Sequence, residues 1–520
     1  MKHPLSRRDF VRAFVQTSAA WAAVQALPSF AQTQVASTPA DFDANVAKHP
    51  SLTPYKGVSD ATGDLRCDSL TITGRWPAEL LGRFYRNGPA LFERGGQRYQ
   101  HWFDGDGMVQ QFSFNGGKVA HRGALVRTHK LLTEQKAGKF VYSAFGSHIQ
   151  SDLPLQGPDS LNPANTSVIE HGGRLMALWE GGSAYELNAS DLSTRGPVTW
   201  KAGLEQVPFS AHPKRDANGH LWNIGSFGNR LIAWHIDPQG NLVDAKIGAS
   251  PYPNGMVHDM AVTEQFLVVP LPPVKLNFSA LSSGGAEQAF ALDSKEPLRI
   301  LVIRKDDLTQ RRVFELPAQM VFHVGNAFER ADGNVSLSFV GSPHTEFLRQ
   351  GALAVLRGEP SQAGSASTQL VELNLSTGRA TLTAMDDRVE FPQVDPRRVG
   401  QAAQHLLSTS SWMGYAGCEG SYHGVQIRDV VSGKLKRFDY GEHMVVEEHL
   451  MVPKPAGVGV GVGAGAGELD AWLMGTSFDV KRQVTVLNVL DAARIEDGPV
   501  AQAALPYKLP FGFHGHFAGA

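Results

Sequence analysis

The chain has 520 residues, of which 42% are hydrophobic and 19% charged, and its formal net charge at pH 7 is −2. This composition excludes a coiled coil and a disordered chain, and the absence of a basic excess argues against nucleic acid as a partner. With 54 Gly and 30 Pro the chain is rich in turns. Its length suits several average domains or one large closed β architecture.

The N-terminal segment predicts an export signal. Arg7 and Arg8 form a twin-arginine pair, an Ala-rich apolar stretch follows, and a small-residue cleavage motif ends at Ala31. We therefore expect a periplasmic protein, since no later stretch is long and apolar enough to span a bilayer. The expected division is a signal peptide at 1–31, a linker at 32–49 and a single domain at 50–520.

Short hairpin patterns recur along the rest of the chain. In each, an apolar run meets a polar turn with Gly, Asn or Asp, and a second run follows. The clearest examples cover residues 112–126, 184–196, 232–245, 371–383 and 425–440. Hairpins repeated around a ring describe a β-propeller, and the chain is long enough for about seven blades of roughly 40–50 residues. We expect an all-β, seven-bladed propeller.

Three other segments carry weaker predictions. Residues 454–470 are of low complexity and read as an exposed loop, and a short helix is expected after Pro396. The two cysteines, Cys67 and Cys418, allow either one disulfide or two thiols, but no thiolate metal site. A metal must therefore be held by histidine or carboxylate.

Four of the 19 histidines stand beside strand-like apolar runs: His212, His258, His323 and His514. Intervals of 46 and 65 residues between the first three are near the length of one blade. Because blades converge on a central axis, one imidazole from each of several inner strands would meet there, and neutral imidazoles bind iron, copper or zinc. Taken singly, each histidine is more often a hydrogen-bonded structural residue than a ligand.

The sequences around these residues resemble carotenoid cleavage oxygenases. The resemblance rests on GRFYRNGPALFERGGQRYQHWFDGDGMVQQFSF (82–114), ANTSVIEHGGRLMALWEGGSAYELNASDLST (164–194), VEFPQVDPR (389–397), the terminal FHGHF and the four histidine contexts. It runs from about residue 50 to the end, in the order that the family has. It implies a seven-bladed propeller with Fe(II) on its axis and with O2 as co-substrate.

The same resemblance implies the site residues. The iron ligands would be His212, His258, His323 and His514, with His516 a neighbour that does not bind. Three glutamates would orient imidazoles: Glu180 for His258, Glu390 for His323 and Glu448 for His514. Glu448 is the least certain, because Glu447 precedes it and His449 stands where the family usually has Pro. Each glutamate has a surface salt bridge as its alternative.

Elementary chemistry supports this arrangement. A ligating imidazole needs its other N–H held, and a carboxylate does this well. A carboxylate buried without such a partner is costly. Four protein ligands leave open positions on an octahedral iron for O2. The resemblance implies that the reaction is oxidative cleavage of a C=C bond into two carbonyl products. No dinucleotide fingerprint is present.

The resemblance implies that the substrate is a polyene or a stilbene. Stilbene cleavers of this family are expected to place a Tyr and a Lys near the metal, yet residues 123–128 hold no Tyr, and Thr166 and Ser167 stand where the Lys is expected. Residues 129–163 read as an insertion, from which three side chains could still reach the site: Lys136, Lys139 and Tyr142. We therefore expect a carotenoid or apocarotenoid substrate, with a stilbene as the alternative.

An apolar substrate predicts an apolar tunnel. Six phenylalanines lie near the motifs: Phe103, Phe227, Phe322, Phe328, Phe511 and Phe513. Residues 267–285 read as an apolar loop at the tunnel mouth that touches a membrane, with a packed loop between blades as the alternative. Outside this interpretation stand a non-catalytic propeller binding module and a zinc hydrolase, for which four protein ligands are a poor fit. The oligomeric state is not predicted.

Overall fold

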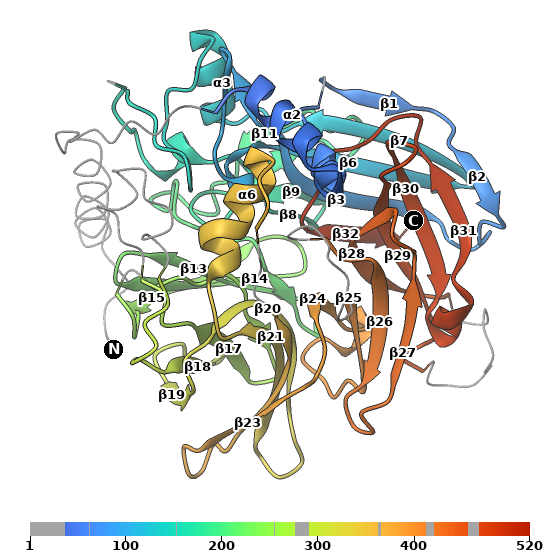
Figure 1. Ribbon diagram of the computed structural model, residues 1–520. Coiled ribbons are helices and arrows are strands. Elements are labelled where there is room, and N and C mark those ends of the chain that lie inside the picture. Colours follow the sequence, from blue (N-terminus) through green and yellow to red (C-terminus); the bar gives the residue numbers. More distant parts are fainter. Residues whose placement is uncertain are drawn as a thin grey trace.

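The computed structural model describes residues 37–61, 63–151, 153–253, 255–275, 291–361, 366–411, 421–455 and 467–519. Within them, seven antiparallel sheets surround a common centre, so the predicted seven-bladed β-propeller is confirmed (Figure 1). The predicted signal peptide, most of the low-complexity stretch and Cys418 lie outside the described residues, and Cys67 is half-buried. Export therefore stays a prediction.

Each blade runs from an inner strand near the axis to an outer strand at the rim, and its strands follow in that order. Blade 1 has β32 (Gly515–Gly519), β3 (Gly82–Leu91), β6 (Asp106–Asn115), β7 (Lys118–Leu125) and β1 (Leu65–Cys67). Blade 2 has β8 (Ser167–His171), β9 (Arg174–Leu178), β10 (Tyr185–Leu187) and β11 (Thr194–Pro197). Blade 3 has β12 (Lys214–Arg215), β13 (Leu221–Phe227), β14 (Arg230–Ile236) and β15 (Leu242–Ala249). Blade 4 has β16 (Ala261–Val262), β17 (Phe266–Leu271), β18 (Leu298–Arg304) and β19 (Arg311–Leu316).

The remaining blades follow the same plan. Blade 5 has β20 (Met320–Glu329), β21 (Val335–Ser342), β22 (Ser367–Leu373) and β23 (Ala380–Ala384). Blade 6 has β24 (Val389–Gln393), β25 (His405–Ser410), β26 (Gly424–Asp429) and β27 (Leu435–Asp439). Blade 7 has β28 (Met444–Pro453), β29 (Ala471–Asp479), β30 (Val484–Asp491), β31 (Pro499–Ala504) and β2 (Thr71–Gly74). A small ribbon of β4 (Glu93–Arg94) and β5 (Gln97–Arg98) stands apart.

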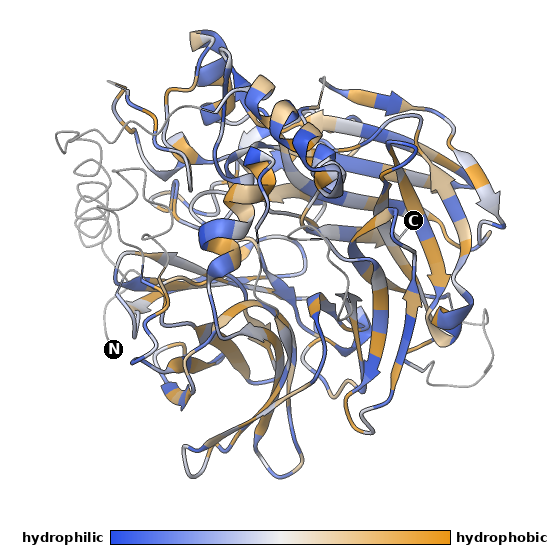
Figure 2. Ribbon diagram, viewed as in Figure 1, coloured by the Kyte–Doolittle hydropathy of each residue, from blue (hydrophilic) through white to orange (hydrophobic). Residues whose placement is uncertain are grey.

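All five predicted hairpins are present. They are β6–β7, β10–β11, β14–β15, β22–β23 and β26–β27. Apolar side chains fill the space between neighbouring sheets, as where Val268 and Phe314 of blade 4 pack with Leu337 and Phe339 of blade 5. In Figure 2 the hydrophobic positions accordingly alternate with hydrophilic ones along many strands.

The α-helices of the described residues lie on one side of the sheets (Figure 1). They are α2 (Pro39–Lys48), α3 (His129–Ala137) and α6 (Ala352–Arg357). Helix α2 falls in the segment predicted as a linker, and its Phe42 and Val46 are buried against Val355 and Leu356 of α6. No helix of the described residues is long and apolar enough to cross a membrane.

Two local predictions differ from the structure. The helix expected after Pro396 is a single 3₁₀ turn, Pro396–Arg398, because strand β25 begins soon after it at His405. Residues 267–271 of the expected tunnel loop belong to strand β17, where they pair with β18 and are buried. An apolar run of this kind is equally typical of a core strand. Residues 276–285 lie outside the described part of the chain.

The two ends of the domain close the ring. The C-terminal strand β32 pairs with β3, so blade 1 joins the last residues to Gly82–Arg86. Strand β2 is in turn the outer strand of blade 7, where it pairs with β31. Each of these sheets therefore contains strands from both ends, and the ring is held by hydrogen-bonded ladders.

Gly82 provides a test of this closure. Its φ is +127°, and a Cβ there would collide with the backbone oxygen of Ala518 in β32. We expect Gly82→Ala to lower the free energy of unfolding by about 2 kcal/mol more than Gly116→Ala does. Gly116 also has a positive φ, +56°, but nothing lies within 4 Å of its added Cβ. Equal losses, measured by urea unfolding, would contradict a closure that depends on this contact.

His449 is the residue that departs from the family pattern, and it lies in β28 next to a bulge between Val446 and His449. Its ring is 1% exposed. One nitrogen lies 2.8 Å from the backbone oxygen of Glu447, and the other lies 3.0 Å from the Tyr440 hydroxyl. Burial lowers the pKa of His449 from 6.5 to about 4, so it is neutral in the folded protein.

A pH dependence follows from this neutral histidine. In the unfolded chain His449 takes up a proton below about pH 6.5, whereas the folded protein resists protonation until about pH 4, so acidification favours unfolding. Between pH 7 and pH 5 this amounts to about 2 kcal/mol. In urea unfolding, the free energy of unfolding of the parent should fall between pH 7 and pH 5 by about 2 kcal/mol more than that of His449→Gln. Parallel losses would mean that His449 is protonated in the fold.

Candidate metal centre

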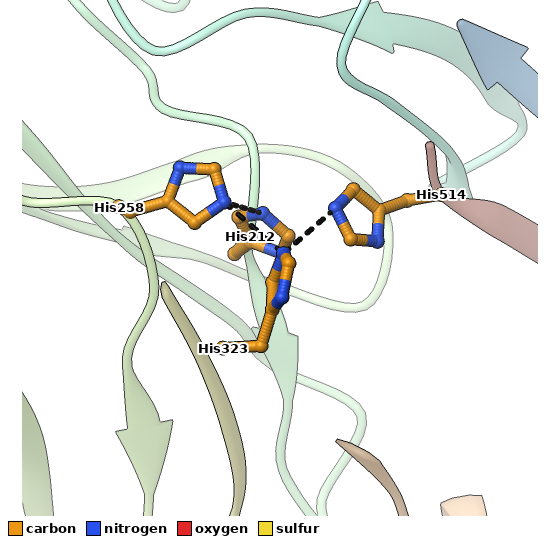
Figure 3. Close-up of side chains that lie close together, drawn as sticks. All are labelled: His212, His258, His323 and His514. Atoms are coloured by element: carbon orange, nitrogen blue, oxygen red, sulfur yellow. Dashed lines mark hydrogen bonds between the residues drawn. The ribbon is translucent and has the colours of Figure 1, made fainter. Parts of the chain in front are cut away.

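The four predicted histidines meet at the centre of the propeller (Figure 3). His212 and His258 precede the inner strands β12 and β16, His323 lies in β20, and His514 directly precedes β32. All four residues are buried, between 6% and 9% exposed. His516 lies further along β32 and is not a member of this group.

The nitrogens are spaced as ligands of one metal ion would be. The Nε2–Nε2 distances are 3.1 Å for His212–His258, 3.2 Å for His258–His323 and 3.1 Å for His323–His514. Two nitrogens at right angles, each about 2.1 Å from a metal, lie about 3.0 Å apart. Four imidazoles converging without a carboxylate among them therefore fit a divalent transition metal.

The ring separations favour six-coordinate over tetrahedral geometry. A tetrahedral set has six equal separations, but the ring centroids of His212 and His514 are 4.4 Å apart, and those of His258 and His514 are 6.5 Å apart. The His258–His514 separation is larger than the other five, which lie between 4.4 and 5.3 Å. This pattern matches an octahedron in which His258 and His514 would lie opposite each other. Two positions would then stay open. This distribution argues against the closed tetrahedral site of a structural zinc protein.

Three glutamates hold three of the imidazoles. Glu180 lies 2.7 Å from Nδ1 of His258, and Glu390 lies 2.5 Å from Nδ1 of His323. Glu448 lies 2.9 Å from Nδ1 of His514 and also accepts the backbone N–H of Gly515 at 2.7 Å. These are the pairings that the family resemblance implies, and they leave each Nε2 free to face the centre.

The blades divide these roles among themselves. The histidines come from blades 1, 3, 4 and 5, and the glutamates from the turn after β9 in blade 2, from β24 in blade 6 and from β28 in blade 7. Each blade therefore contributes one of these seven side chains. A bulge in β20, β24 or β28 accompanies His323, Glu390 and Glu448 and re-aims each side chain.

The electrostatics differ between the imidazoles: burial lowers the pKa of His514, whereas at His323 the charge and the hydrogen bond of Glu390 outweigh burial and raise the pKa. Burial lowers the pKa of His212 well below its usual value, and the neighbouring imidazoles add to this effect. Burial opposes ionisation of Glu180 and Glu448, but their contacts with His258 and His514 outweigh it, so both carboxyl pKa values are lowered. Neutral imidazole is the form that binds metals.

Aromatic rings form the surroundings. The Phe322 ring lies 5.0 Å from His258, and Phe103 contacts Phe322, Phe145, Phe347 and Phe513. Of the six phenylalanines singled out from the sequence, Phe103, Phe322 and Phe513 thus gather beside the histidines. Phe511 lies in the same apolar cluster as Phe513, whereas Phe227 packs in another cluster.

Neither Lys136 nor Lys139 of the insertion reaches this centre. Lys136 and Lys139 are exposed at the end of α3, and Tyr142 is buried in a small cluster with Leu161 and Trp179. Thr166 lies closer, with its hydroxyl 3.3 Å from Glu180. Lys136, Lys139 and Tyr142 therefore do not form a phenol-binding Tyr–Lys pair at the centre.

Sequence reasoning missed two features of the centre. Phe391 has a φ of +54°, stacks on His323 with ring centroids 5.2 Å apart, and donates its backbone N–H to Glu390 at 2.7 Å. Asp259 lies beside His212 and pairs with Lys214 at 2.9 Å. The only sequence signal for Asp259 is its position directly after His258.

Comparisons with known proteins agree with this centre. The sequence profile of the family described as "Retinal pigment epithelial membrane protein" matches residues 60–519. The apocarotenoid-15,15'-oxygenase of Synechocystis sp. is 30% identical over 483 residues, which are 86% of this chain and 92% of that protein. Lignostilbene-alpha,beta-dioxygenase isozyme III of Sphingomonas paucimobilis is 29% identical over 480 residues, with coverage of 87% and 94%.

A solved structure shares the fold. The cobalt-substituted apocarotenoid oxygenase of Synechocystis superposes with a TM-score of 0.80 at 27% identity, over 90% of this chain and 99% of that chain. The profile match, the relatives and the four converging histidines together show that this chain belongs to the carotenoid cleavage oxygenase family and is an oxygenase with a four-histidine metal site.

Proposed function

We propose that this protein is an Fe(II)-dependent dioxygenase that cleaves one C=C bond of a carotenoid or apocarotenoid with O2. The observation that carries the proposal is the set of four buried imidazoles, three of which are held by carboxylates. Fe(II) bound there supplies open positions at which O2 is activated. The balanced reaction adds both oxygen atoms of O2 across the double bond and yields two carbonyl compounds.

The residues of this chain have three tasks in that reaction. The imidazoles hold the metal through Nε2, and the glutamates fix ring direction and keep the Nδ1 protons in place. The phenylalanines beside His258 offer an apolar surface to a polyene and exclude water from the reacting carbons. No protein side chain is required as an acid or base, because no proton is gained or lost overall.

The substrate assignment rests on polarity. The Phe322 ring beside His258 is hydrocarbon, Lys136 and Lys139 of the insertion are exposed, and the buried Lys130 is paired with Asp106 and Glu134. An unfunctionalised polyene fits such surroundings better than a phenol, whose buried hydroxyl would need a partner. A stilbene is the second candidate, because a lignostilbene dioxygenase is almost as similar to this chain as the apocarotenoid oxygenase.

Metal binding is the first expected outcome. Protein purified without air should hold close to one Fe(II) per chain, and His514→Ala should hold at least about tenfold less, since one of four ligands is lost. Iron is measured by elemental analysis after dialysis against a weak chelator. His516→Ala is the matched control, because it removes a neighbouring imidazole that does not face the centre. Equal iron in His514→Ala and its parent would contradict the proposed site.

Product analysis tests the reaction itself. Iron-loaded protein is incubated with an apocarotenal, a full-length carotenoid and a hydroxystilbene, and products are identified by mass spectrometry under 18O2. Paired carbonyl products from a polyene, each labelled, with none in His514→Ala, are expected. Aromatic aldehydes from the stilbene alone would reject the polyene assignment and leave the metal site intact.

A further inference from the structure

The four imidazoles are not held alike. Glu180, Glu390 and Glu448 each lie within 3 Å of one imidazole Nδ1, whereas the nearest carboxylate to Nδ1 of His212 is Asp259, at 4.0 Å. That distance is too long for a hydrogen bond. The described residues therefore leave His212 without the direct carboxylate partner that its three neighbours have.

Asp259 is built into the centre by other contacts. Its side chain is 3% exposed. Oδ1 accepts the backbone N–H of Met260 at 2.6 Å and the ammonium of Lys214 at 2.9 Å, and Oδ2 accepts the backbone N–H of Val324 at 2.7 Å. A buried carboxylate with a cation and two N–H donors is fully compensated.

Each of these contacts adjoins a metal ligand. Lys214 is two residues after His212, Asp259 itself follows His258, and Val324 follows His323. The three segments belong to blades 3, 4 and 5, which share no β ladder with one another. Val324 lies at a bulge of β20, where Asp259 of the neighbouring blade 4 accepts a hydrogen bond from its N–H. One carboxylate therefore ties together the segments beside three of the four ligands, through the backbone N–H groups of Met260 and Val324 and through the Lys214 side chain.

We propose that Asp259, with Lys214, is the positioning group of the fourth histidine and sets the relative places of His212, His258 and His323. The pair acts through the backbone and through its nearby charge, in place of a direct bond to the ring. This inference rests on the metal site proposed above. It assigns to blade 4 a second task, in addition to supplying His258.

The test uses Co(II) as the probe, because its affinity and its visible absorption report ligand geometry without turnover. Asp259→Asn and Lys214→Met are expected to bind Co(II) at least about tenfold more weakly in competition with a chelator, and to shift the absorption bands. Lys214→Arg keeps a cation beside Asp259 and is expected to restore both. Thermal unfolding without metal checks that each variant is folded.

A matched control separates positioning from general stability. Lys454 and Asp491 in blade 7 form a similar pair, at 3.0 Å with side chains 7% and 11% exposed. Lys454→Met should leave Co(II) affinity and spectrum unchanged. Lys214 is 22% exposed and tolerates Met more readily than Asp259 tolerates Asn, so Lys214→Met decides the matter if the other variant does not fold.

Two results would overturn the inference in different ways. Parental affinity and spectrum in folded Lys214→Met would show that the pair does not position His212, as would an equal loss in Lys454→Met. Failure of the unaltered protein to bind either Co(II) or Fe(II) would instead reject the metal site itself, and the inference with it.

Discussion

The structure depends on placing seven polar side chains on the axis of an otherwise apolar ring. Burying a carboxylate or an imidazole is costly unless each finds a partner. In this ring every glutamate meets an imidazole, and the remaining faces of the imidazoles meet one another at about 3.1 Å, a spacing that suits one cation. The centre is therefore stable only when the blades are correctly placed relative to one another, and its contacts in turn favour that placement of the blades.

Much of the fold could be predicted because its signals are local. A polar turn between two apolar runs requires only neighbouring residues, and all five hairpins identified in this way are present. The four histidines could be proposed as a group because inner strands of a propeller converge, but their pairing with Glu180, Glu390 and Glu448 came from the family resemblance. No local pattern relates Glu390 to His323, which lies 67 residues away.

What the sequence did not reveal depends on contacts between distant segments. Helix α2 is stabilised by packing its apolar residues against α6, which lies more than 300 residues later in the chain. Without this distant partner, the sequence of α2 reads as a linker. Residues 267–271 read as a loop because two prolines follow them, but pairing with β18 buries them. The sequence marks Asp259 only by its position directly after His258. Its partners Lys214 and Val324 are brought to it only by the convergence of three blades.

The C-terminal tail shows how closure and chemistry coincide. Two adjacent glutamates at the bulge of β28 bind different parts of this tail. Glu447 accepts the backbone N–H of Gly512 at 2.9 Å and pairs with the buried Arg86. Glu448 contacts the His514 ring and accepts the backbone N–H of Gly515. Strand β32 then continues into its ladder with β3. Strand β32 cannot leave this ladder without displacing the metal ligand that directly precedes it. His514 is therefore both a ligand of the centre and the anchor of the strand that closes the ring.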